Sequence, residues 1–175
     1  MVDHTENVLR AAAQSLRDVV APAVDDTNPL AREQLHLVIE WLDFLRERLP
    51  LAFERQRCEL QQNLELGETL LERYVPANDG LTRAVQRGRE VLTRSGVRAG
   101  EVRDSSTLLA EAISGIVKQV GADDPQCGRD IEIAVLDSTR NFLELQRSWF
   151  LPLSPEPDPA ALPELARVLE GNTQS

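Results

Sequence analysis

The chain has 175 residues, of which 42% are hydrophobic and 27% are charged. A chain of this size can bury a core of its own without disulfides or metals. Its formal net charge of −10 argues against a nucleic-acid or membrane partner, because an acidic surface repels phosphate backbones and anionic lipid. The sequence has no apolar run that could span a bilayer and no signal-peptide pattern at its start. We therefore expect a cytoplasmic protein.

Apolar residues recur at helical spacing through the first part of the chain. One helix is expected over 5–20, ended by Pro22 and the polar residues that follow it. A second helix is expected over 29–49, with a proline in its first turn. Because Pro50 has no N–H to donate within a helix, we expect a kink or a break there before the apolar seam continues to residue 75.

Three further helices are expected over 81–93, from about 101 or 105 to 120, and over 125–150. The first of these has Asp79 as its expected cap. Half of the ten prolines then fall within twelve residues that begin at Pro152, so an extended strap is predicted. A short helix over 162–170 and a polar tail would end the chain.

These elements place the protein in the all-α class, as a bundle of about five main helices with a Pro-rich C-terminal strap and a short terminal helix. The expected domain organisation is a helical bundle over 1–151, followed by the strap, short helix and polar tail over 152–175. Gly88 and Gly115 fall inside predicted helices, where glycine costs about 1 kcal/mol relative to alanine. We therefore expect both glycines at close contacts between helices.

The segment Pro29–Leu49 is apolar over an arc of about 220° at 100° per residue. A helix that lies on a protein surface needs an apolar stripe of only about 100°. The segment Ile131–Leu151 is also apolar over a wide arc. We expect both segments to be covered on more than one side, by their own chain, by a second copy or by another protein.

The aromatic residues fall into two groups, one in residues 41–74 and one in residues 142–150. Large rings dominate core energetics where they meet. We therefore predict that the second and fifth helices touch, with Trp41 or Phe44 near Phe142 or Trp149. The alternative is that one group forms a partner surface, since such rings are enriched at interfaces. The candidate partner-binding residues are Trp41, Phe44, Trp149 and Phe150.

The local pattern of Glu33, His36 and Glu40 has the spacing of one half of a two-helix metal site. The other half is missing, since the only other histidine is His4, and the three side chains lie opposite the apolar arc. We interpret them as a solvated acidic stripe. Cys127 falls in the first turn of a predicted helix without a recognisable base partner. No catalytic residue, metal ligand or cofactor is expected.

The stretch from residue 81 to residue 103 holds six arginines and two glutamates within an acidic chain. Such charge asymmetry is typical of an anion-binding segment, and the candidate residues are Arg83, Arg87, Arg94 and Arg98. The alternative is that these arginines pair with acidic side chains of the same or a neighbouring subunit.

The sequence thus favours a non-catalytic helical interaction protein that self-associates or serves as an accessory subunit of a larger complex. One alternative is a ligand-binding or catalytic bundle with an internal pocket lined by Trp41, Phe44 and Phe142, which would take a small molecule. A second alternative is an anion-binding regulator that uses the arginine-rich segment.

Overall fold

The computed structural model describes residues 4–75, 78–154 and 156–171. Within these residues every regular element is a helix, which confirms the all-α class. The expected element over 29–75 is divided by a short 3₁₀ turn at Leu49–Leu51, where Pro50 removes a helical hydrogen bond. The helices are α1 His4–Ser15, α2 Pro29–Arg48, α3 Ala52–Arg73, α4 Asp79–Thr93, α5 Ala99–Asp123, α6 Pro125–Phe150 and α7 Leu165–Gly171.

The packing divides the chain into two compact units. Unit 1 consists of Met1–Ala52 and Trp149–Pro159, and unit 2 consists of Phe53–Ser148 and Ala160–Ser175. The predicted division into a bundle domain over 1–151 and a C-terminal segment over 152–175 stays a prediction. The predicted polar tail lies outside the described residues from Asn172 onward.

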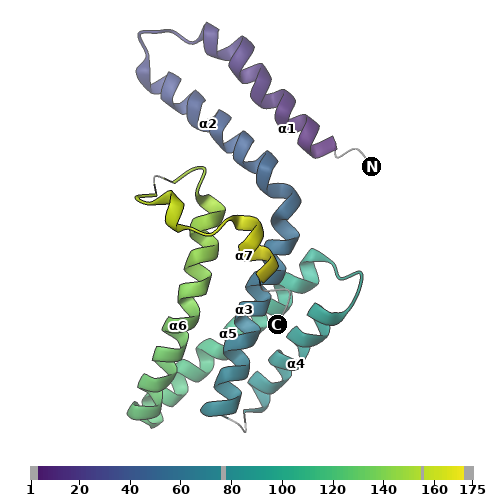
Figure 1. Ribbon diagram of the computed structural model, residues 1–175, viewed down its shortest axis with the longest axis vertical. Helices are drawn as coiled ribbons and strands as arrows, with labels where there is room; N and C mark the ends of the chain where they lie inside the picture. The colour runs from purple at the N-terminus through teal and green to yellow at the C-terminus, as the bar shows by residue number, and fades with distance from the viewer. Residues whose placement is uncertain (1–3, 76–77, 155, 172–175) are drawn as a thin grey trace. The chain divides into compact units, whose positions relative to one another are not determined.

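Unit 1 contains an antiparallel hairpin of α1 and α2 (Figure 1). The first helix was expected to end at residue 20, but helical turns continue through Pro22. Leu16–Val20 forms a widened π turn, in which the N–H of Ala21 donates to the carbonyl of Leu16, and Ala21–Ala23 forms a 3₁₀ turn. Pro22 has no N–H to donate, and its ring would clash with the preceding turn of a regular α-helix. The widened turn before the proline avoids this clash.

The hairpin loop is held by polar side chains. The carboxylate of Asp25 accepts the backbone N–H and the hydroxyl of Thr27, each at 2.8 Å. These two hydrogen bonds, the backbone one first, lower the pKa of Asp25 below its usual value. The side chain of Asn28 then accepts the N–H of Ala31 at 3.1 Å and caps α2.

An aromatic corner joins α2 to the end of α6 within unit 1. The rings of Phe44 and Phe150 stack with centroids 5.6 Å apart. The side chain of Arg48 donates to the carbonyl of Trp149 at 3.0 Å and lies 5.8 Å from the centroids of the Phe44 and Trp149 rings. The predicted contact between the helix over 29–49 and the helix over 125–150 is therefore confirmed, although the ring that stacks on Phe44 is Phe150 and neither Phe142 nor Trp149 as predicted.

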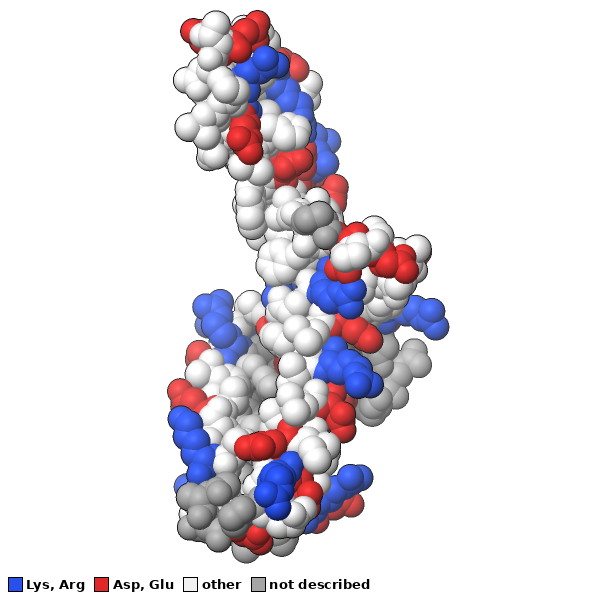
Figure 2. Space-filling model, turned by 90° about the vertical axis from the view of Figure 1, so that its left-hand side faces the viewer, with Lys and Arg blue, Asp and Glu red and all other residues white. Residues whose placement is uncertain are grey.

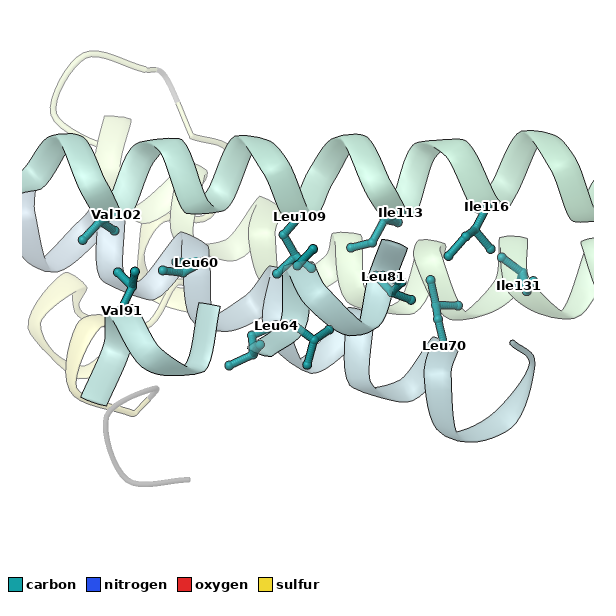
Figure 3. Packing of buried hydrophobic residues seen from close by; sticks show 12 residues of the cluster. Leu60, Leu64, Leu70, Leu81, Val91, Val102, Leu109, Ile113, Ile116 and Ile131 are labelled. Carbon is teal, nitrogen blue, oxygen red and sulfur yellow. The ribbon is translucent and has the colours of Figure 1, made fainter. Parts of the chain in front are cut away.

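Unit 2 has its own hydrophobic core, built from one side of each of its long helices. Figure 3 shows how side chains of α5, among them Leu109 and Ile113, point toward those of α3 and α4. The core residues are Leu60, Leu64, Leu70, Leu81, Ala84, Val85, Val91, Val102, Leu109, Ile113, Ile116 and Ile131. The cap of α4 is Asn78, whose side chain accepts the N–H of Leu81 at 2.8 Å, and not Asp79 as expected.

Two glycines allow α3, α4 and α5 to approach closely. A Cβ on Gly67 would lie 3.0 Å from Cγ2 of Val85 and 3.2 Å from Cδ1 of Leu109. A Cβ on Gly88 would lie 3.2 Å from Cδ1 of Leu64, so the predicted close contact at Gly88 is confirmed. The same prediction for Gly115 is wrong, because that glycine is exposed and has no neighbour within 4 Å of its Cβ position.

We predict opposite effects for alanine at the two kinds of glycine. Gly67→Ala adds a methyl group between two packed side chains, and we expect it to lower the free energy of unfolding by about 1–2 kcal/mol. Gly115→Ala should raise it by about 0.5–1 kcal/mol, since only helix propensity changes there. Denaturant unfolding of both variants tests this, and equal stabilisation by both would contradict the packing at Gly67.

Candidate partner-binding face

Six large apolar side chains are exposed along α2 and at the first residue of the 3₁₀ turn that follows it. Their exposed fractions run from 64% for Leu30 to 39% for Leu45. At 100° per residue they share one arc of about 120°, so they form a stripe and are not scattered. The six residues are Leu30, Leu37, Val38, Trp41, Leu45 and Leu49.

The first arm of the hairpin extends this stripe. The ion pair between Arg17 and Asp43 spans the hairpin and marks its polar side. Val8 of α1 lies about 180° from Arg17, which is in the π turn that continues α1, and Trp41 lies about 160° round α2 from Asp43, so both point to the opposite side. We call the surface formed by the six residues named above together with Val8 and Val19, which are 65% and 67% exposed, the apolar face.

Charged side chains gather on the other side of the hairpin, as Figure 2 shows. His36 and Glu40 lie there, with Nε2 of the imidazole 3.1 Å from a carboxylate oxygen, and both side chains are largely exposed. Among the described residues, no three or more His, Cys, Asp or Glu side chains are grouped so that they could hold a metal ion. The stripe of Glu33, His36 and Glu40 is thus the outer, polar side of an amphipathic hairpin.

The structure separates the four candidate partner-binding residues. Trp41 lies in the apolar face and is 49% exposed, with its ring edge against Phe44 at a centroid distance of 5.7 Å. Phe44 and Trp149 are buried, and Phe150 is half-buried against Phe44. Of the four, Trp41 is therefore the one that a partner could reach without the aromatic corner opening.

The second wide apolar arc also remains partly uncovered. On α6, Ile133, Leu136 and Leu143 are exposed on one side of the helix, and Phe142 is 40% exposed. Arg140 projects within the same arc as Leu136 and Leu143, at about 40–60° from them. This part of unit 2 differs from the apolar face because charged side chains are interleaved with the apolar ones.

The arginine-rich segment is divided between two environments. Arg83 and Arg87 line a groove of about 470 Å³ between α4 and α5, together with Leu108 and Glu111. Arg94 pairs with Glu101, which also accepts the backbone N–H of Arg98 at 3.1 Å. The alternative of pairing within the chain therefore holds for Arg94, while Arg83 and Arg87 converge on one groove.

The carboxylate of Glu101 provides a test of this pairing. The backbone N–H of Arg98, and after it the side chain of Arg94, hold the pKa of Glu101 below the usual value. A carboxylate with a lowered pKa stabilises the fold above its unfolded-state pKa, and this contribution is lost as the pH falls through the folded-state pKa. We predict that NMR titration finds the pKa of Glu101 below 4.5.

In the same titration, Arg94→Ala should move the pKa of Glu101 upward while leaving it depressed, since the backbone hydrogen bond remains. Arg103→Ala provides a control in the same segment. A pKa of Glu101 that does not respond to Arg94→Ala would contradict the ion pair. Arg94 would then again be a candidate for binding an external anion.

No family model, curated protein or solved structure matches the chain. Within its described residues, none of the helices is long and apolar enough to cross a lipid bilayer. Along α3, α4 and α5, the described residues of unit 2 line three grooves whose lining does not include the aromatic residues expected in an internal pocket.

Proposed function

We propose that the protein is a non-catalytic helical interaction protein, which self-associates or serves as an accessory subunit through the apolar face of its α1–α2 hairpin. One observation carries the proposal: eight exposed apolar side chains lie on one side of the hairpin. Contiguous exposed apolar surface of this kind is typical of protein interaction sites, whereas singly scattered apolar residues are ordinary.

Exposure of this apolar surface to water is unfavourable in free energy. Burial of apolar area contributes about 25 cal/mol per Å², so a partner that covers the face gains stability from each of its side chains. Trp41 supplies the largest ring there, and rings of this size are enriched among the residues that dominate binding energy. A cytoplasmic location remains part of this proposal, on the grounds of charge and composition alone.

We predict that the apolar face is required for association. Trp41→Ala should weaken the complex by about tenfold or more, since a central aromatic residue commonly contributes over 1 kcal/mol to binding. The measurement is the native mass of the protein isolated from its host, compared with the 19.5 kDa of the single chain.

Phe142→Ala is the matched control, because Phe142 is similarly exposed but belongs to the part of α6 that lies in unit 2. Loss of the complex with Trp41→Ala alone would support the face as the interaction site. Equal loss with both variants, or a host protein that runs as a single chain without companions, would contradict the proposal.

A second candidate function is anion binding in the groove between α4 and α5, favoured by the convergence of Arg83 and Arg87 there. Arginine binds carboxylate and phosphate through a planar pair of donors. The carboxylate of Glu111 also lines the groove, and it opposes an anion by repulsion. An anion would therefore bind weakly unless it also used the apolar side chain of Leu108.

We predict that inorganic phosphate shifts the amide NMR signals of α4 around Arg83 and Arg87, and that added salt weakens this binding. Arg87→Gln should reduce the affinity, and Glu111→Gln should raise it by removing the repulsion. Arg103→Gln should change neither. Signals that respond equally in all three variants would indicate general charge screening and would exclude a site in the groove.

A further inference from the structure

The apolar face differs from an ordinary surface because it contains little charge. None of its eight side chains is charged, although α2 alone carries three glutamates and an aspartate on its other sides. Arg48 is the one charged residue of α2 within the arc of the face, at the same angle as Leu30, and its guanidinium lies over the rings of Phe44 and Trp149 and donates to the carbonyl of Trp149. A partner must therefore bring an uncharged surface, because a charge buried without a counter-ion is costly.

We propose that this partner is a second copy of the chain, and that the apolar faces of two α1–α2 hairpins pack together as a four-helix bundle. The inference rests on the proposed function and names its partner. A second copy brings the same uncharged apolar side chains, so neither hairpin buries an unpaired charge. Each two-helix layer then receives the second layer that a helical core requires.

The size of the face agrees with what a stable dimer needs. α2 has 20 residues, which corresponds to a length of about 30 Å. Two packed helices are about 20 Å wide, given an interaxial distance of about 8–10 Å and helix diameters of about 10–12 Å. The face therefore measures about 600 Å² before side-chain relief is counted. Standard interfaces bury about 800 Å² per partner, with smaller ones near 600 Å².

A two-fold axis suits the position of Trp41, which lies just past the middle of α2. In an antiparallel pairing about an axis near this residue, Leu37 of one copy lies opposite Leu45 of the other, since both are four residues from Trp41. Such an isologous contact uses the same patch on both chains and closes after two copies. The product is thus a dimer and not a growing filament.

The charge at the edge of the face argues against a lipid surface as the occupant. Glu33, Glu40 and Glu47 follow one another at seven-residue spacing along α2, beside the stripe of leucines. Helices that lie in a membrane surface carry lysine and arginine in such positions, where they meet anionic headgroups. A row of glutamates repels those headgroups, whereas in the dimer it stays at a solvent-exposed edge, where salt screens the repulsion between the rows of the two copies.

The test is sedimentation equilibrium of the purified full-length protein over a range of concentrations. We expect a reversible dimer with twice the single-chain mass of 19.5 kDa. Val38→Glu on α2 and Val8→Glu on α1 each place a charge in the face and should raise the dimer dissociation constant by about 100-fold, because the symmetric contact contains the change twice.

The matched controls place the same residue elsewhere on the same helices. His36→Glu lies on the polar side of α2, and Gln14→Glu lies on an exposed side of α1, about 120° round the helix from Val8. Both should leave the dissociation constant within about threefold of the wild type. Circular dichroism of every variant at a concentration where the wild type is monomeric establishes that the helices are retained, so that loss of the dimer reports on the interface.

Three outcomes would overturn the inference. The first is a wild type that stays monomeric at all concentrations, the second is a dimer that resists both face variants but is lost with Leu136→Glu on α6, and the third is co-sedimentation of the wild type with phosphatidylcholine vesicles that Val38→Glu abolishes. A monomer whose host complex still requires Trp41 would leave the proposed function standing with a different protein as partner. A monomer without any such complex would remove both.

Discussion

The structure of unit 1 depends on one constraint, which is that α2 is apolar over a wider arc than a single neighbouring helix can cover. α1 covers the part of the arc around Ile39, and the small side chain of Ala13, which is 1% exposed, allows the two helices to lie close together. The aromatic corner covers the part around Phe44. The remaining arc of about 120°, from Leu30 to Leu49, faces solvent in the single chain.

The aromatic corner explains how unit 1 is assembled from segments about one hundred residues apart. Arg48 makes two kinds of contact in this corner. Its guanidinium donates to the carbonyl of Trp149 and lies over the rings of Phe44 and Trp149. After Phe150 the chain turns back at once, with the N–H groups of Leu153 and Ser154 both donating to the carbonyl of Phe150. The Pro-rich segment therefore begins with a turn and not with the extended strap that its composition predicts.

The helices could be predicted from sequence because apolar periodicity and helix-ending residues agree along most of the chain. The break at Pro50 follows from its missing N–H. The contact between α2 and α6 follows from the grouping of large aromatic rings in these two segments. The turns through Pro22 could not be foreseen, because a widened π turn before a proline leaves no distinctive composition. The surroundings of a glycine inside a helix could not be predicted either. Gly88 lies at a close contact between helices, whereas Gly115 has no neighbour near its Cβ position.

The candidate site could be predicted in kind but not in detail. Periodicity identifies a helix with too much apolar surface, but the buried or exposed state of each ring depends on what packs against it. Phe44 and Trp41 are three residues apart, yet Phe44 faces Phe150 while Trp41 reaches solvent. The arginines of residues 81–103 also differ because their neighbours differ. Glu101 pairs with Arg94 and accepts the backbone N–H of Arg98, whereas Arg83 lines the groove between α4 and α5.

The contrast between the two exposed apolar regions bears on which of them is an interface. On α6, Arg140 lies within about 40–60° of Leu136 and Leu143, so a partner that covers these leucines has to pair or dehydrate its charge. On the hairpin, the arc from Leu30 to Leu49 contains one charged residue, Arg48, whose guanidinium lies over the rings of Phe44 and Trp149 and donates to the carbonyl of Trp149. An interface requires such a low density of charge, since each charge inside it has to be paired or dehydrated on binding. The scarcity of charge, more than the presence of leucine, is what favours the hairpin as the interaction surface.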